Sequence, residues 1–224
     1  MKEFKVKVCG NTRAEDVRAA DLFGADMVGV VVDIESSRRS VSARTAAEIM
    51  AQAEKALRAV LLLDPPPDRL FEILDITGPD IVHFTGDEAP SLLEELRKRF
   101  EGDIFKSIHL PPAGEGVSAP EKAFEIIREY EECGADTIVI DTRDAERGMY
   151  GGTGKVSDWK AAAAIVEASP LPVLLAGGIN MDNVDKALRE VEPHGVDLAS
   201  GLEKNIGEKD HELMKAFIEK VKNI

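Results

Sequence analysis

The chain has 224 residues, 44% of them hydrophobic, which is enough for one large core or two modest ones. Its formal net charge of −14 at pH 7 argues against nucleic acid or an anionic membrane as a partner, because both attract basic surfaces. No run of residues approaches the ~20 apolar residues of a bilayer span, and the first residues lack the apolar core of a signal peptide, so we expect a cytoplasmic protein.

The chain contains two cysteines, Cys9 and Cys133. Two are too few for a disulfide framework, and neither lies in a spacing that is typical of metal ligands. We therefore expect no structural zinc and no metal site.

The strands are predicted from a repeat. Four segments share the pattern Gly-x-Asp followed by aliphatic residues, and they begin at Gly24, Gly78, Gly134 and Gly195. Their spacing is about twice the ~30 residues of one strand–helix unit, which predicts one more strand between each pair and one before the first. Aliphatic runs at 4–9, 58–63, 103–110 and 172–176 supply these strands, so the sequence predicts eight.

Helical patterns separate the strands. Apolar residues recur at i, i+3, i+4 and i+7 within 120–132, within 184–191 and within 214–221. Thr12 and Glu15 have the spacing of a capping box, which predicts a helix that starts just after the first strand.

Aliphatic strands that alternate with amphipathic helices indicate a parallel sheet with both faces buried, and eight such units predict a (β/α)8 barrel. A doubly wound open sheet is the competing fold, although it does not by itself explain the even spacing. No break in composition suggests a second domain, so we expect a single domain over 1–224.

In such barrels the active site lies at the C-terminal ends of the strands. Gly177 and Gly178 follow the seventh predicted strand, and Ser200 and Gly201 follow the eighth. Glycines there let backbone N–H groups approach an anion, although any one of them could simply make a tight turn. Their occurrence after both strands favours a phosphate site.

Asp141 ends the sixth strand after a threonine and three aliphatic residues. Partial desolvation raises the pKa of such a carboxyl group and suits it to act as a general acid; a helix-capping or loop-anchoring role is the alternative. Cys9 ends the first strand on the same rim, and Gly10 beside it leaves room for a ligand. Near a helix N-terminus or an arginine its pKa would fall and give a thiolate base, whereas a buried packing role is the alternative. For Cys133 packing is the preferred interpretation.

Arg38 and Arg39 follow the second strand. Arginines in a loop are usually solvated, but a guanidinium is also the natural partner of a substrate carboxylate. His83 and His109 lie in predicted strands without a neighbouring ligand pattern, and the sequence assigns neither a role.

Several motifs occur together in one order: KVCGNTRAEDVRAA, GADMVGVVVDIESSRRSVS, YGGTGKVSDW at 150–159, PVLLAGGINMDNV and GVDLASGLEKNIGEKD. In these motifs the chain resembles phosphoribosylanthranilate isomerase, a family of tryptophan biosynthesis, over essentially its whole length. It differs in HFTGDE, where Thr85 stands at the position of a common histidine, and in having Arg38 before Arg39.

The resemblance implies a (β/α)8 barrel that converts N-(5-phosphoribosyl)anthranilate to 1-(carboxyphenylamino)-1-deoxyribulose 5-phosphate by an Amadori rearrangement, with no cofactor. It implies that Cys9 is the general base, that Asp141 is the general acid and that Arg39 holds the anthranilate carboxylate. The expected phosphate contacts are Gly177, Gly178, Ser200 and Gly201, together with Gly152 and Gly154. The expected partner is thus a phosphorylated small molecule, and the expected assembly is a monomer or a homodimer.

Two other functions remain open at this stage. The related isomerase of histidine biosynthesis would be expected to have aspartate at the end of the first strand and a second glycine-rich phosphate loop in the first half of the chain. A non-catalytic barrel that binds a sugar phosphate would keep the glycine loops but would not need Cys9 together with Asp141.

Overall fold

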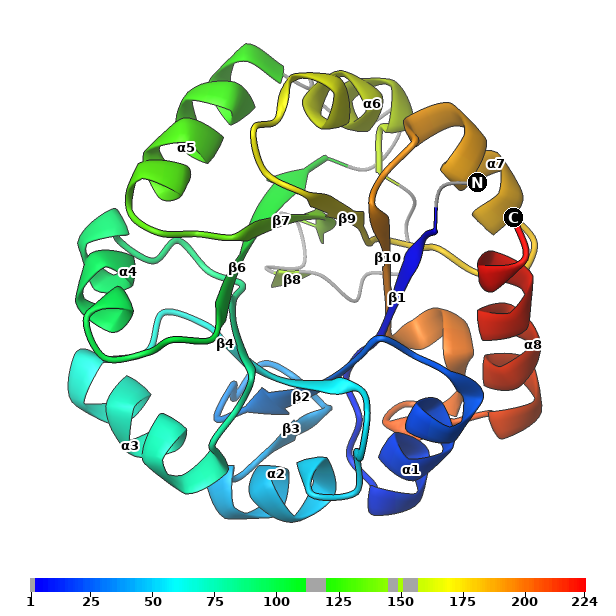
Figure 1. The fold of residues 1–224 in the computed structure, drawn as a ribbon, viewed down its shortest axis with the longest axis horizontal. Helices are drawn as coiled ribbons and strands as arrows, with labels where there is room; N and C mark the ends of the chain where they lie inside the picture. The colour runs from blue at the N-terminus through cyan, green and yellow to red at the C-terminus, as the bar shows by residue number, and fades with distance from the viewer. Residues whose placement is uncertain (1–2, 112–119, 145–148, 151–156) are drawn as a thin grey trace.

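The structure is a computed structural model that describes residues 3–111, 120–144, 149–150 and 157–224. Within these residues, eight parallel strands form a closed barrel and eight α-helices surround it (Figure 1). The barrel strands are β1 (Lys5–Val8), β2 (Met27–Val32), β4 (Leu57–Leu62), β5 (Ile81–Phe84), β6 (Asp103–Leu110), β7 (Thr137–Asp144), β9 (Val173–Leu175) and β10 (Gly195–Leu198). The helices are α1 (Ala14–Phe23), α2 (Ala43–Met50), α3 (Pro67–Thr77), α4 (Pro90–Arg97), α5 (Pro120–Glu132), α6 (Trp159–Ala168), α7 (Val184–Val191) and α8 (His211–Lys222).

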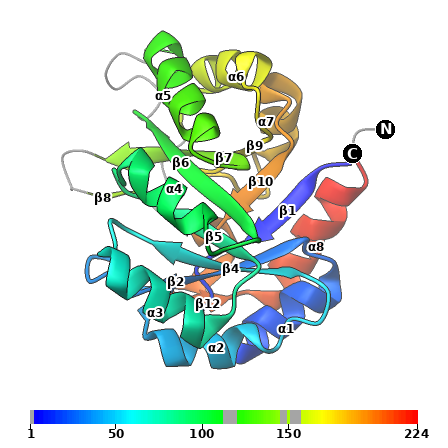
Figure 2. The same cartoon turned by 60° about the vertical axis from the view of Figure 1, so that its left-hand side comes forward.

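The sheet closes on itself. The strand order is β1-β10-β9-β7-β6-β5-β4-β2, and β2 returns to β1 with Lys7 opposite Met27. This closure excludes the doubly wound open sheet and confirms the predicted barrel. In the side view of Figure 2 the barrel strands run obliquely between the helices, as strands of a closed barrel must.

The loops that follow some barrel strands contain additional short strands. β3 (Ser40–Val41) pairs with the end of β2, and β8 (Met149–Tyr150) pairs with β7 in the antiparallel direction. After β10 comes a 3-10 turn, η1 (Ser200–Leu202), and then a small hairpin of β11 (Glu203–Asn205) and β12 (Glu208–Lys209). None of these was predicted from the sequence.

The Gly-x-Asp repeat has a physical basis in three of its four copies. Gly24, Gly78 and Gly134 follow α1, α3 and α5 with φ values of 92°, 49° and 99°, in the left-handed region that favours glycine. The aspartates two residues later, Asp26, Asp80 and Asp136, accept hydrogen bonds from backbone N–H groups of a neighbouring strand. The fourth copy differs because Gly195 already belongs to β10, which places Asp197 inside the barrel.

Helix starts follow the sequence in part. Asp158 and Asp210 cap α6 and α8 by accepting hydrogen bonds from backbone N–H groups of the first turn. The predicted capping box is wrong: α1 begins at Ala14 after Arg13, and the hydroxyl of Thr12 donates to the carbonyl of Gly207 instead. A tertiary contact with the hairpin region therefore replaces the local cap.

Two apolar layers form the core. The larger lies between the strands and the helices, and the smaller fills the barrel with residues such as Met27, Ala59, Ile81 and Phe105. Because side chains alternate along a strand, every second residue of each strand points into the barrel. In the described part of the chain, no helix is both long and apolar enough to cross a membrane.

Candidate active site

A pocket of about 390 Å³ opens at the C-terminal ends of the barrel strands. Of the predicted site residues, seven line it: Cys9, Arg39, Asp141, Gly177, Gly178, Ser200 and Gly201. Gly152 and Gly154 lie outside the described residues. The barrel thus brings together side chains from opposite ends of the sequence, as the strand-end argument predicted.

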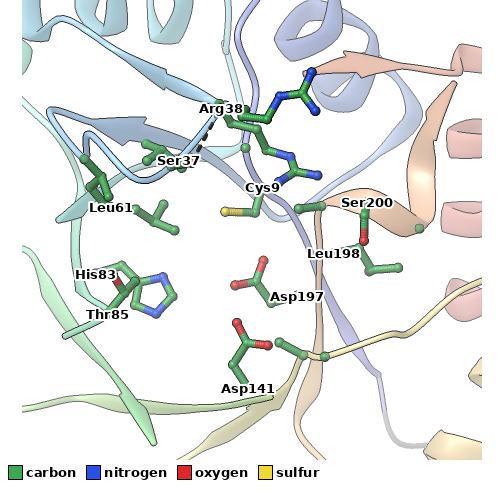
Figure 3. Close-up of a pocket in the computed structure, with 18 of the residues that line it drawn as sticks. Cys9, Ser37, Arg38, Leu61, His83, Thr85, Asp141, Asp197, Leu198 and Ser200 are labelled. Atoms are coloured by element: carbon green, nitrogen blue, oxygen red, sulfur yellow. Dashed lines mark hydrogen bonds between the residues drawn. The ribbon is translucent and has the colours of Figure 1, made fainter. Parts of the chain in front are cut away.

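Cys9 follows β1 directly, and its backbone N–H donates to the carbonyl of Leu198, which fixes it against β10. The side chain is 6% exposed and its thiol points into the pocket (Figure 3). Burial raises the pKa of the Cys9 thiol, and Asp197 raises it further, while Lys7 and Lys209 oppose the rise. The net change is upward, so the lowered pKa expected from a nearby arginine is wrong: desolvation outweighs the cations.

Asp141 lies in β7, and its carboxyl group faces the same space as the Cys9 thiol (Figure 3). One carboxylate oxygen accepts a hydrogen bond from the N–H of Thr142 at 2.7 Å. Burial raises the pKa of Asp141 to about 6, although the hydrogen bond from Thr142 opposes this. The raised pKa predicted from the sequence is confirmed in direction, and the group holds a proton closer to neutral pH than an exposed aspartate does.

Arg39 is held in place by Glu203 of the hairpin. Its Nε and Nη2 atoms each donate to a carboxylate oxygen of Glu203 at 2.7 Å. The ammonium of Lys209 also contacts Glu203, at 3.2 Å, and donates to the carbonyl of Cys9 at 2.6 Å. Since a guanidinium has five N–H donors and Glu203 uses two, Arg39 retains donors for a second anion at the pocket.

Gly10 packs closely against the side chain of Arg39. Its φ of 67° is left-handed, and a Cβ atom there would lie 2.6 Å from Cδ of Arg39. The missing side chain at Gly10 therefore makes room for the arginine, while Gly10 itself lines the pocket, so its role toward a ligand stays a prediction. Arg38, the second predicted arginine, is exposed at the pocket mouth.

The two glycine loops are tightly packed from behind. Gly177 and Gly178 both have left-handed φ values, and a Cβ on Gly177 would lie 2.1 Å from the hydroxyl of Thr142. A Cβ on Gly201 would lie 2.1 Å from the carbonyl of Ile179, so the first loop packs against β7 and the second packs against the first. Among the described residues, we find no hydrogen-bond acceptor for the N–H groups of Gly177, Gly178 and Ser200. These N–H groups suit an anion.

Three polar residues of the site were missed by sequence reasoning: Lys7, His83 and Asp197. Lys7 and Asp197 form an ion pair inside the barrel, with 2.7 Å between Nζ and Oδ2, and His83 lines the pocket. A signal existed, because Lys7 lies two residues before Cys9 and alternation puts both on the inner face of β1. Glu203 and Lys209 carried no comparable signal.

The arrangement suits acid and base chemistry beside a bound anion. A carboxyl group and a thiol, both with raised pKa values, point into the same pocket, and an arginine and N–H groups that have no acceptor within the described part of the chain lie at its rim. In the described residues, no group of His, Cys, Asp and Glu side chains could hold a metal ion.

Comparisons with known proteins agree with this chemistry. Residues 6–220 match the family described as N-(5'phosphoribosyl)anthranilate (PRA) isomerase. The chain is 35% identical to N-(5'-phosphoribosyl)anthranilate isomerase 1 of Methanosarcina mazei, covering 97% of this chain and 94% of the relative. A crystal structure of phosphoribosyl anthranilate isomerase from Thermotoga maritima matches with a TM-score of 0.82 and 28% identity over 99% of this chain and 100% of that one. A further PRAI structure, in complex with reduced 1-(o-carboxyphenylamino)-1-deoxyribulose 5-phosphate, matches with a TM-score of 0.79 and 25% identity over 99% of this chain and 100% of that one.

Proposed function

Because the chain belongs to the N-(5'-phosphoribosyl)anthranilate isomerase family, we propose that Cys9 is the general base and Asp141 the general acid of its reaction. The chain is an aldose–ketose isomerase of tryptophan biosynthesis, which converts N-(5'-phosphoribosyl)anthranilate to 1-(2-carboxyphenylamino)-1-deoxyribulose 5-phosphate. The roles of its individual residues form the proposal.

The reaction needs one proton donor and one proton acceptor. Asp141 donates a proton to the furanose ring oxygen, the C1–O bond breaks, and the nitrogen lone pair forms an iminium bond to C1. The cation makes the C2–H bond acidic, and the Cys9 thiolate takes that proton to give an enolamine. The C2 hydroxyl then gives its proton to the Asp141 carboxylate while C1 takes up the proton held by Cys9, which yields the ketone and returns both groups to their starting protonation states.

Protonation states limit how much free enzyme is ready to react. At pH 7 a pKa of about 6 leaves about one Asp141 in ten protonated. Because burial raises the pKa of the Cys9 thiol, the thiolate is the minor form at neutral pH. Molecules that combine a protonated Asp141 with a Cys9 thiolate are therefore a small share of the free enzyme. Groups that stabilise the thiolate without deprotonating Asp141 raise this share and hence the rate.

The rim residues position the substrate in this proposal. The N–H groups of Gly177, Gly178 and Ser200 bind the phosphate, with Gly201 keeping the second loop close to its neighbour. Arg39, oriented by Glu203, binds the anthranilate carboxylate with its remaining donors. Anchoring both ends of the substrate holds C2 and the ring oxygen between base and acid, which is the positioning contribution to catalysis. A phosphorylated small molecule is the only partner that this proposal requires, and monomer or homodimer stays a prediction.

One observation carries the assignment: a thiol and a carboxyl group, both with raised pKa values, point into the same pocket from β7 and the end of β1 (Figure 3). The test is turnover of freshly generated N-(5'-phosphoribosyl)anthranilate by wild type, Cys9→Ser and Asp141→Asn. Each substitution should lower kcat at least about 100-fold, the low end for loss of a general acid or base. Cys133→Ser, which changes the other cysteine, should keep wild-type turnover. Near wild-type kcat in both site variants would remove the proposed mechanism.

A further inference from the structure

Lys7 occupies an unusual position for a lysine. Its side chain is 0% exposed and lies inside the barrel, below the pocket. The ammonium donates to Oδ2 of Asp197 at 2.7 Å and lies 3.2 Å from Nδ1 of His83. The pKa of Lys7 is lowered by burial but raised by Asp197 and Cys9, with a net rise, so the side chain is charged at neutral pH.

The ammonium is also close to the proposed base. Lys7 lies on the inner face of β1 and Cys9, two residues later, follows that strand with the same parity, so both side chains approach Gly29 of β2. A Cβ atom built on Gly29 would lie 3.0 Å from Sγ of Cys9 and 3.4 Å from Nζ of Lys7. The missing side chain at Gly29 is what allows the thiol and the ammonium to meet.

Stability alone does not account for this ion pair. Burying a lysine and an aspartate carries a desolvation penalty that their attraction often fails to offset, and apolar replacements of similar size are commonly as stable or more so. Oδ1 of Asp197 is moreover buried without a hydrogen-bond partner in the described structure, which adds to the cost. A functional reason for a cation at this depth is therefore needed.

His83 fixes the direction of the ammonium. Burial lowers the pKa of His83 well below its usual value, with Lys7 and Lys106 acting in the same direction, so the ring is neutral. A charged Lys7 can only donate, which makes Nδ1 of His83 the acceptor and places the ring proton on Nε2. Nε2 then donates to the hydroxyl of Ser107 at 2.9 Å. Asp197 and His83 thus hold two of the three ammonium N–H donors and leave the third for the thiolate.

We propose that Lys7 is a positioning residue whose ammonium stabilises the thiolate of Cys9, and that Asp197 and His83 hold it in place for this purpose. This deepens the general-base role of Cys9 and rests on that proposed function. Figure 3 shows the His83 ring and the Asp197 carboxylate on the same side of the Cys9 thiol. The Lys7 ammonium contacts both of these groups.

The other charged groups near Cys9 are already engaged. Lys209 donates to two carbonyl groups and to Glu203, and Arg39 is neutralised by Glu203. Asp197 disfavours the thiolate, but its effect on Cys9 is smaller than that of Lys7. The titratable or charged side chains around Cys9 are Lys7 on its own strand, Arg39 after β2, His83 on β5, Asp141 on β7, Asp197 on β10, and Glu203 and Lys209 in the hairpin.

The test measures the thiolate directly. Wild type and Lys7→Met are alkylated with iodoacetamide between pH 6 and 10, and the rate at each cysteine is followed by mass spectrometry of its peptide. Removing an opposite charge at this range should displace the Cys9 profile by about one pH unit or more, which lowers its alkylation rate about tenfold at pH 8. Cys133, on the outside of the barrel, should keep its wild-type profile in both proteins and serves as the internal control. In turnover assays at pH 7, kcat should fall about tenfold with KM nearly unchanged.

A second pair of variants covers the case in which Lys7→Met does not fold. His83→Gln keeps an acceptor for the ammonium, whereas His83→Leu does not. The Leu variant should show the displaced Cys9 profile and the Gln variant the wild-type one.

A folded Lys7→Met protein with the wild-type Cys9 profile would overturn the proposal, as would identical Cys9 profiles in the two His83 variants. The alkylation readout does not depend on catalysis. If Cys9→Ser kept wild-type turnover while Lys7→Met displaced the alkylation profile, the general-base role would fail and the electrostatic role of Lys7 would stand.

Discussion

Gly10→Ala perturbs the contact between Gly10, which follows Cys9 at the end of β1, and the side chain of Arg39. The new Cβ would lie 2.6 Å from Cδ of Arg39, closer than any normal carbon–carbon contact, and Gly10 has a φ of 67°. The arginine has little freedom to retreat, because two hydrogen bonds of 2.7 Å tie it to Glu203. We therefore expect Gly10→Ala to displace the guanidinium.

The magnitude has two parts. Placing alanine in the left-handed region costs about 1–2 kcal/mol of folding stability. Forcing a methyl group into an occupied space adds about 1–3 kcal/mol. In catalysis, loss of a charge-assisted hydrogen bond to the substrate carboxylate is worth about 1.5–3 kcal/mol, which raises KM at least about tenfold. We expect kcat to fall by a smaller factor, because neither the acid nor the base is removed.

The matched control is Gly24→Ala. Gly24 has a φ of 92°, and a Cβ there would meet nothing within 4 Å, so it shares the backbone strain without the clash. Urea unfolding should show a larger loss of stability for Gly10→Ala than for Gly24→Ala, and only Gly10→Ala should raise KM. Equal losses of stability together with an unchanged KM would refute the close packing of Gly10 against Arg39 and its role in binding.

Further predictions concern charge. Asp141→Asn removes a carboxyl group with a pKa of about 6 in the folded protein against an ordinary 3.8, so its ionisation lowers wild-type stability progressively as the pH rises from 3.8 to 6, and the full penalty is present above pH 6. The variant should be more stable than wild type above pH 6 and equal to it below pH 3.8 in urea titrations. The change of slope that ionisation of Asp141 produces near pH 6 in the wild-type profile of kcat/KM should be absent from Asp141→Asn, and its persistence would contradict the assignment of the acid. Glu203→Gln should raise KM about tenfold through a misplaced Arg39. Burial raises the pKa of Glu203, but Arg39 and Lys209 together lower it by more, so the net change is downward. The ionised Glu203 side chain therefore stabilises the folded protein above pH 4.5, and this contribution disappears as the pH falls through the lowered pKa. Glu203→Gln should therefore be less stable than wild type at pH 7, by a margin that shrinks in acid.

The barrel could be predicted because its determinants are local. Aliphatic strands and helix-ending glycines recur along the chain at a regular spacing, and each repeat predicts the same strand–helix unit. The strand-end argument then located Cys9, Asp141 and the glycine loops, since every parallel strand of a barrel ends at the same rim.

What escaped prediction depends on tertiary contacts. The hairpin with Glu203 and Lys209 consists of strands of three and two residues, too short for a hydrophobic alternation to show. Asp197 could not be told apart from the other aspartates of the Gly-x-Asp repeat, whose side chains accept backbone hydrogen bonds and pair with lysine or arginine away from the pocket. Lysine side chains are usually exposed, so a buried Lys7 was not expected. Its position two residues before Cys9, which puts both side chains on one face of the strand, was the only sign that it points into the barrel. The pKa of Cys9 was predicted in the opposite direction because burial, the larger effect, has no sequence signature.

The central claim is that Cys9 takes the proton from C2 after Asp141 has opened the ring. The direct measurement is turnover of substrate carrying deuterium at C2 of the ribose by Cys9→Ser and by Asp141→Asn. Loss of the base makes C2 proton removal the slow step, so Cys9→Ser should react more slowly with the deuterated substrate than with the ordinary one. Loss of the acid makes ring opening slow, so Asp141→Asn should turn both substrates over at equal rates. Equal rates in Cys9→Ser, or slower deuterated turnover in Asp141→Asn alone, would contradict the assignment of base and acid.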